Sequence, residues 1–125
     1  MYTQGYSIYK NNSVNYASKD KLLLMLVDGA VKFSKMARQA IIDKNIKKAH
    51  ENIIKTENIF GELMVSLDRS QGEWTDQIFS VYEFINYKLV EANLTKKVEV
   101  IDEAIPLIEE IRDLWYEVDK RAKRA

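Results

Sequence analysis

The chain contains no cysteine, and its 125 residues include one proline, four glycines and a single histidine. Without cysteine it can form neither a disulfide nor a thiolate metal site. The longest apolar run, residues 22–27, ends at Asp28. It is far shorter than the ~20 residues that a membrane-spanning helix needs, so we expect no membrane insertion. No basic segment followed by an apolar run opens the sequence, which predicts a cytoplasmic protein without a signal peptide.

The chain also lacks a net charge, because 19 Lys and Arg residues balance 19 Asp and Glu residues. A neutral total gives no electrostatic reason to expect nucleic acid or an anionic membrane as a partner. The distribution is uneven, with 10 basic and 5 acidic residues in positions 1–60 and 9 and 14 in positions 61–125. We interpret this asymmetry as two oppositely charged faces that attract each other inside one domain.

Few helix breakers and apolar residues spaced three and four apart predict long helices and an all-α fold. The pattern predicts four of them, over residues 18–42, 46–67, 75–94 and 96–119, with Ser18, Thr75 and Thr95 as capping residues. Pro106 lies inside the last pattern and predicts a kinked but continuous helix. Similar lengths and short connections favour an antiparallel up-down-up-down four-helix bundle, in which the first helix, rich in lysine, lies beside the acidic last helix.

The two ends of the chain differ from the bundle, residues 18–119. Residues 1–17 show no helical face, and their aromatic residues stand among Gly, Ser, Asn, Gln and Thr. We expect an extended N-terminal arm that docks Tyr6, Ile8 and Tyr9 on an apolar surface. Residues 120–125 form a basic C-terminal tail, which we expect to fray.

The inventory of catalytic groups is small. His50 is the one histidine, and the Glu-x-x-His motif of carboxylate-bridged metal bundles is absent, because Lys47 stands three residues before it. We therefore expect no metal, no cofactor and no enzyme activity. One alternative stays open, since histidine phosphotransfer domains are also four-helix bundles with an exposed histidine. The residues after His50 fit that class poorly, because the lysine that should closely follow it is misplaced at Lys55.

Apolar residues exceed what four core stripes require. The second and third helices carry additional large side chains beyond their stripes, which predicts an apolar groove for a partner helix or for the chain's own arm. The residues that we expect to line it are Ile54, Phe79, Tyr82 and Tyr87.

The order of several short motifs resembles the flagellin export chaperone (FliS) family. Tyr9, Val14 and Ala17-Ser18 precede a Leu-rich segment that ends in Asp28-Gly29-Ala30. Further matches follow in the second to fourth helices: Glu62-Leu63, Leu67-Asp68, Gly72, Val81 to Ile85, Leu89, Ala92-Asn93, Arg112 and Trp115. Lys19, Val27 and Gln71 depart from the usual pattern of the family, and none of these departures removes a catalytic group.

This resemblance implies a cytoplasmic chaperone that binds the disordered C-terminal segment of flagellin. Masking that segment would prevent premature filament assembly, and the loaded chaperone would deliver flagellin to the flagellar export gate. The arm would then either cover the groove when no client is present or grip the client. Physically, a disordered client offers apolar residues whose burial offsets the cost of ordering it.

Overall fold

The structure, a computed structural model, describes residues 17–124, with side chains described from Lys19 onward. Within that range it contains four long α-helices, one 3-10 turn and no strand. The bounds are α2 Ala17–Ile42, α3 Ile46–Ser66, η1 Arg69–Gln71, α4 Glu73–Thr95 and α5 Val98–Arg124. The all-α fold that the sequence predicts is thus confirmed.

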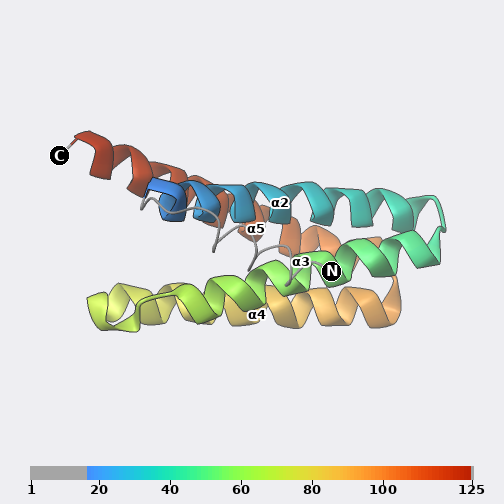
Figure 1. Ribbon diagram of the computed structural model, residues 1–125. Helices are drawn as coiled ribbons and strands as arrows, with labels where there is room; N and C mark the ends of the chain where they lie inside the picture. Colours follow the sequence, from blue (N-terminus) through green and yellow to red (C-terminus); the bar gives the residue numbers. More distant parts are fainter. Residues whose placement is uncertain (1–16, 125) are drawn as a thin grey trace.

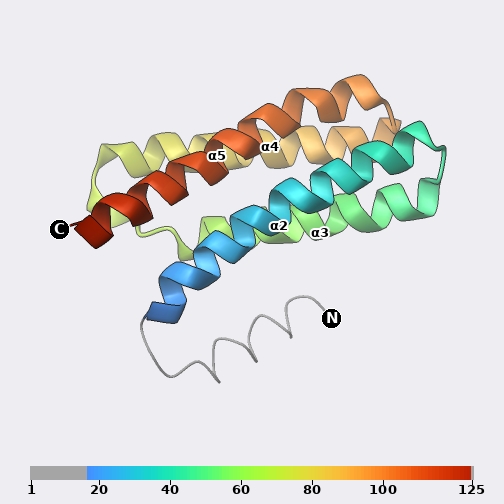
Figure 2. The same ribbon diagram turned by 90° about the horizontal axis from the view of Figure 1, so that it is seen from above.

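The four helices form an antiparallel bundle in which each lies beside two others. Helix α2 packs against α3 and α5, and α4 packs against the same two helices from the opposite corner (Figures 1 and 2). The start of α2, the η1 turn and the end of α5 therefore meet at one end of the bundle (Figure 1). This arrangement confirms the up-down-up-down topology and brings the first and last helices together.

None of the three predicted capping residues, Ser18, Thr75 and Thr95, precedes its helix as a cap. Helix α4 begins at Glu73 after Gly72, whose φ of 133° favours glycine. Thr75 is the third helical residue; it is buried, and its hydroxyl donates a 2.6 Å hydrogen bond to the Gly72 carbonyl. Thr95 ends α4 instead of capping α5, because Lys96 adopts the left-handed conformation that closes a helix.

The first and last helices also extend further than the pattern indicates. Ser18 lies within α2 instead of preceding it, and Asp20 stands in the first turn, where the helix dipole favours a negative charge. Helix α5 continues to Arg124, so residues 120–124 are helical. Pro106 lies inside α5, which is continuous as predicted. A proline can interrupt the backbone hydrogen bonds of a helix without ending it where tertiary packing holds both halves.

The core runs the length of the bundle and is built mainly from aliphatic side chains. Gly29 permits a close approach of α2 to α3, since a Cβ atom there would lie 3.2 Å from the Ile59 Cδ1 atom. Fully buried Phe60 and Tyr82 pack edge to face, with ring centroids 5.8 Å apart. Geometry of this kind adds to the free energy gained from burying the rings.

Opposite charges line the contact between α2 and α5, as the sequence predicts. Lys35 Nζ lies 3.0 Å from a Glu109 carboxylate oxygen, and the Arg38 guanidinium donates to the Asp102 carboxylate. Each pair is exposed and contributes little free energy alone. Together they favour this pairing of helices over others.

Candidate functional site

Six large apolar side chains gather on the outer surface where α3 packs against α4, and we call this surface the α3–α4 face. His50 of α3 lies 3.0 Å from the Asn93 side-chain amide of α4, which fixes how the two helices are aligned. Residues seven apart share one side of a helix. The large apolar residues of these two helices that are left at least partly exposed on this side are Ile54, Val65, Phe79, Tyr87, Val90 and Leu94.

These side chains are far more exposed than core residues. Val65 is 83% exposed, Leu94 82% and Tyr87 65%. Isolated apolar residues on a surface are ordinary, but a set along one pair of helices is typical of a docking surface for another protein. The α3–α4 face therefore offers apolar area that this bundle leaves uncovered among its described residues.

The structure brings three of the predicted groove residues to this face. Ile54 and Phe79 are half-buried and Tyr87 is exposed. The Phe79 ring is partly covered by the Arg69 guanidinium, which lies 4.2 Å from the ring centroid and is held by an ion pair to Asp76. Such a cation over an aromatic ring stabilises it at a partly wet surface.

The fourth predicted groove residue, Tyr82, is not on the surface. It is only 1% exposed, and its hydroxyl oxygen accepts a 2.8 Å hydrogen bond from the Trp115 indole nitrogen. The prediction was wrong because a tyrosine can enter a core once its polar tip finds a partner. Burial raises the pKa of Tyr82 to about 12, so the phenol stays protonated at neutral pH.

The predicted arm residues Tyr6, Ile8 and Tyr9 lie outside the residues that the structure describes. Their role as contacts of a partner therefore stays a prediction.

A polar interruption lies at the middle of the α3–α4 face. Glu57 stands seven residues after His50 in α3, and Asn86 stands seven residues before Asn93 in α4, so each lies on the side of its helix that borders the other helix. Burial raises the pKa of the Glu57 carboxyl, and the nearby His50 acts in the opposite direction. The Asn86 Oδ1 atom is buried and has no hydrogen-bond partner among the described residues.

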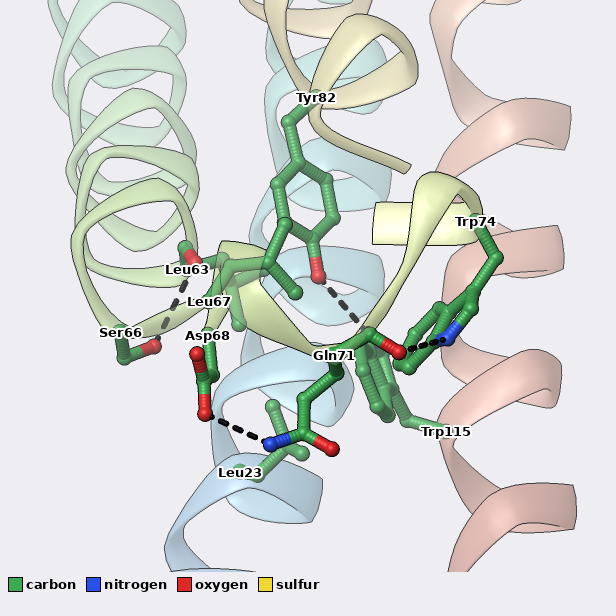
Figure 3. A pocket seen from close by; sticks show the side chains of 9 residues that line it. All are labelled: Leu23, Leu63, Ser66, Leu67, Asp68, Gln71, Trp74, Tyr82 and Trp115. Carbon is green, nitrogen blue, oxygen red and sulfur yellow. Dashed lines mark hydrogen bonds between the residues drawn. The ribbon is translucent and has the colours of Figure 1, made fainter. Parts of the chain in front are cut away.

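A cavity of about 250 Å³ opens at the end of the bundle where the η1 turn crosses it (Figure 3). The Trp74 and Trp115 rings pack edge to face there, with centroids 6.5 Å apart, and the Trp74 indole donates to the Gln71 carbonyl. Asp68 anchors the turn by accepting from the backbone and side chain of Ser70 and the side chain of Gln71, which holds the pKa of its carboxyl low. The lining residues are Leu23, Leu63, Ser66, Leu67, Asp68, Gln71, Trp74, Tyr82 and Trp115.

A smaller hollow of about 120 Å³ adjoins this cavity and shares Leu23 and Trp115 with it. It lies between the start of α2 and the end of α5, where Leu24 and Val118 also line it. Val118 is 41% exposed. The structure thus leaves apolar surface open close to the point where the N-terminal segment joins α2.

Three features bear on catalysis and on membranes. Among the described residues, no three His, Asp or Glu side chains lie close enough together to hold a metal ion. His50 is exposed, and its Nδ1 atom is engaged by Asn93, so its visible role is to align α3 with α4. Within residues 17–124, no helix contains an apolar segment long enough to cross a bilayer.

Comparison with known proteins identifies the family. The model of the family described as flagellar protein FliS matches residues 2–122. The chain belongs to the FliS family. The flagellar secretion chaperone FliS of Bacillus subtilis is 34% identical over 110 residues, covering 88% of this chain and 82% of its own. The FliS of Escherichia coli is 32% identical over 118 residues, covering 92% and 87%.

The fold agrees with this assignment. A crystal structure of a bacterial flagellar chaperone superposes with a TM-score of 0.75 at 17% identity and covers 97% of this chain and 99% of its own. The family match confirms the resemblance that the sequence motifs indicate. The FliS family is one of chaperones and not of enzymes, so we expect the protein to work through protein partners.

Two residues of these surfaces escaped sequence reasoning. Leu94 was overlooked because it is the last residue of the helix predicted over 75–94, although it stands seven residues after Tyr87 on the same side of α4. Trp74 was overlooked because it precedes Thr75, where the helix was expected to begin. A helix begun at the preceding glycine would have placed Trp74 in the first turn.

Proposed function

We propose that this protein is an export chaperone that binds the C-terminal segment of flagellin on the α3–α4 face. The row of exposed apolar side chains on that face, in a member of the FliS family, is the observation that carries the proposal. An amphipathic helix buries its apolar side on such a surface, with anchors three and four residues apart. Helix α3 has 21 residues, about 30 Å, which suits a client helix of several turns.

Covering these side chains would also serve the client. A flagellin segment that is disordered when free exposes apolar residues that promote premature assembly into filaments. Its burial on the chaperone offsets the entropy lost on ordering. We propose that the complex forms in the cytoplasm and is then delivered to the flagellar export apparatus.

We further propose that Tyr6, Ile8 and Tyr9 of the N-terminal arm cover the apolar side chains of the α3–α4 face until a client arrives. The exposure of Val65, Tyr87 and Leu94 on that face supports this role. A covering arm competes with the client, so deletion of residues 2–10 should tighten client binding. Weaker binding after the deletion would show instead that the arm grips the client.

Isothermal titration calorimetry tests the site: the full-length chain is titrated with a C-terminal flagellin peptide from the same organism. Tyr87→Ala should weaken binding by about tenfold, because interface aromatic anchors typically contribute more than ~1 kcal/mol. Phe84→Ala is the matched control. Phe84 is also an exposed aromatic residue of α4, but it lies toward α5, beside Lys88. Equal effects of the two substitutions would place the client elsewhere.

A further inference from the structure

Two tight connections form the end of the bundle that lies opposite the η1 turn. Residues 42–48 lead from α2 into α3, residues 94–99 lead from α4 into α5, and both connections lie at this end of the molecule (Figures 1 and 2). Asn93 holds them together, because its side chain is hydrogen-bonded to His50 of α3 and accepts a 2.8 Å hydrogen bond from Lys96. We call the surface of residues 42–48 and 94–99 the lysine-rich end.

Positive charge is concentrated at the lysine-rich end. It contains five lysines and two acidic residues, Asp43 and Glu99, which gives it a net charge of +3. Lys96 is engaged by Asn93, but the other four lysines are exposed and form no ion pair within the described part of the chain. These four are Lys44, Lys47, Lys48 and Lys97. Their charges are therefore left for a partner outside the bundle.

Aliphatic side chains stand among these lysines. Ile42 ends α2 and is 47% exposed, Ile46 begins α3 and is 55% exposed, and Leu94 is 82% exposed near the end of α4. The backbone of the first connection is fixed, because the N–H groups of Lys44 and Asn45 donate to carbonyls of the last turn of α2, at 3.0 and 2.8 Å. Apolar side chains held at a surface beside unpaired cations are typical of proteins that bind anionic membranes.

We propose that the lysine-rich end docks this protein on the surface of an anionic phospholipid membrane. The four exposed lysines contact the lipid phosphate groups, and the three aliphatic side chains enter the boundary between headgroups and acyl chains. The contact is peripheral, because it uses side chains at one end of the bundle and no membrane-spanning segment. It places the long axis of the bundle away from the membrane and leaves most of the α3–α4 face open.

The zero net charge of the whole chain does not oppose this contact. Exposed charges act on a membrane surface over about one Debye length, roughly 8 Å at physiological salt, whereas α3 alone is about 30 Å long. The acidic residues of α5 that follow Glu99 are also neutralised within the bundle, since Asp102 pairs with Arg38 and Glu103 with Lys88. The local charge of the lysine-rich end therefore decides how it interacts with lipid.

A lipid surface fits this end better than a protein partner does. Residues 42–48 and 94–99 contain no aromatic residue, and aromatic anchors carry much of the binding energy of protein interfaces. Three partly exposed aliphatic side chains also form a small apolar centre, whereas a standard protein interface buries roughly 800 Å² on each partner. Lipid headgroups require no such centre, because they are mobile anions that pair with lysines in many geometries.

Flotation of the full-length chain with lipid vesicles tests the proposal. The chain should float with vesicles of phosphatidylcholine and phosphatidylglycerol but not with vesicles of phosphatidylcholine alone, and added salt should weaken the binding. Lys47→Glu combined with Lys97→Glu should weaken it at least tenfold, because each lysine near an anionic surface contributes. Lys120→Glu combined with Arg124→Glu makes the same change of charge near the other end of α5. This control should alter binding less than twofold.

A second pair of variants tests the apolar contact. Leu94→Ser should weaken vesicle binding about fivefold, because an aliphatic side chain that leaves water on binding is lost. Val65→Ser is the matched control, since Val65 is 83% exposed but lies near the last residue of α3, toward the opposite end of the bundle. It should alter binding less than twofold. Circular dichroism of every variant should match that of the native chain, because all of these positions are exposed.

Three results would overturn the proposal. The first is no binding of the native chain to vesicles with phosphatidylglycerol; binding to soluble poly-glutamate instead would assign the lysine-rich end to an acidic protein. The second is an equal loss in the two charge-reversed pairs, which would mean that binding follows net charge and not this end. The third is equal binding of Leu94→Ser and Val65→Ser. No client takes part in these measurements, so the proposed function stands or falls separately.

Discussion

Tyr82 lies in the core with its hydroxyl oxygen accepting a hydrogen bond from the Trp115 indole, so one polar contact joins α4 to α5 in an otherwise apolar environment. A hydrogen bond of this kind contributes roughly 0.5–1.5 kcal/mol net, and more is lost when one partner is left buried and unsatisfied. The side chain also forms part of the wall of the end cavity (Figure 3). Its loss would therefore affect the packing and the cavity together.

We expect Tyr82→Phe to lower the free energy of unfolding by about 1–2 kcal/mol, because the Trp115 indole would lose its acceptor while the ring packing against Phe60 remains. Urea denaturation followed by circular dichroism measures the change. Tyr87→Phe, at an exposed position, is the control and should change stability by less than about 0.5 kcal/mol. No loss in Tyr82→Phe would mean that water replaces the missing hydroxyl.

The stability advantage of the native chain over Tyr82→Phe should shrink at alkaline pH. The pKa of Tyr82 is raised from 10.0 to about 12 by burial. The unfolded chain therefore releases this proton near pH 10, while the folded chain holds it until about pH 12. The contribution of Tyr82 to stability is complete below pH 10 and is lost as the pH rises through 12. Unfolding free energies measured at pH 9 and pH 11 should converge for the two chains, because Tyr82→Phe lacks this dependence.

Glu57 should show a pH dependence of the same sign, but in the acidic range. Burial raises its pKa above the ordinary 4.5 in the folded state, although His50 opposes the shift. The folded chain thus binds this proton more tightly than the unfolded chain, so stability falls as the pH rises through that range. We expect Glu57→Gln to be more stable than the native chain at pH 7, and the difference to disappear below pH 4.5. Thermal melts across this interval measure it, and a constant difference would contradict the desolvated carboxylate.

At the scale of the helices, two glycines in similar positions have different environments. Gly29 of α2 and Gly61 of α3 both stand inside long helices, where glycine costs up to about 1 kcal/mol relative to alanine. A Cβ atom at Gly29 would meet Ile59 at 3.2 Å, whereas one at Gly61 would meet nothing. Only the first glycine is explained by the packing of the bundle itself.

We therefore expect Gly61→Ala to raise the free energy of unfolding by roughly 0.5–1 kcal/mol, because the helix gains propensity without a clash. Gly29→Ala is the paired comparison and should gain less or lose stability, since the Ile59 side chain must move. Guanidinium denaturation of both variants measures the difference. A larger gain for Gly29→Ala would show that α2 and α3 are not packed as closely as the structure indicates.

The periodicity of the sequence was sufficient to predict four helices and their order, because apolar spacing records which side of each helix is buried. The ends of the helices were less predictable. Thr75 and Thr95 are common capping types, yet Gly72 and Lys96, with positive φ, decide the actual boundaries. A threonine hydroxyl can donate to a backbone carbonyl from inside a helix or accept from a free backbone amide at the start of one. A threonine in the sequence therefore does not by itself show where a helix begins.

At the scale of the whole molecule, the candidate site was only partly predictable. Ile54, Phe79 and Tyr87 were predicted because each is an apolar residue beyond those that a core stripe needs; the structure leaves them at least partly exposed, and their contact with a partner stays a prediction. Tyr82 was misplaced, since its partner Trp115 lies 33 residues away in sequence and on another helix. The end cavity was missed for the same reason, because α2, α3, η1, α4 and α5 all contribute to it. Such contacts follow from the tertiary arrangement and leave no local pattern.

In contrast, the uneven distribution of charge along the chain does indicate which helices are neighbours. The basic residues of α2 and the acidic residues of α5 meet along one contact, where Lys35 pairs with Glu109 and Arg38 with Asp102. The Tyr116 hydroxyl of α5 also donates a 2.6 Å hydrogen bond to Asp28 of α2. These contacts contribute modestly to stability, but the wrong neighbour for either helix would place like charges side by side.

Exchanging one such pair tests this role. We expect Asp102→Arg alone to lower the melting temperature by a few degrees, because it places two guanidinium groups together at the α2–α5 contact. Arg38→Asp combined with Asp102→Arg should restore most of the loss, since the attraction returns with its ends reversed. Thermal melts at low and high salt measure the effect, which should shrink as salt screens the charges. Glu117→Arg, which breaks an ion pair within α5 alone, should change the melting temperature less and serves as the control. Failure of the double exchange to recover stability would mean that the charges of α2 and α5 do not help to select each other as neighbours.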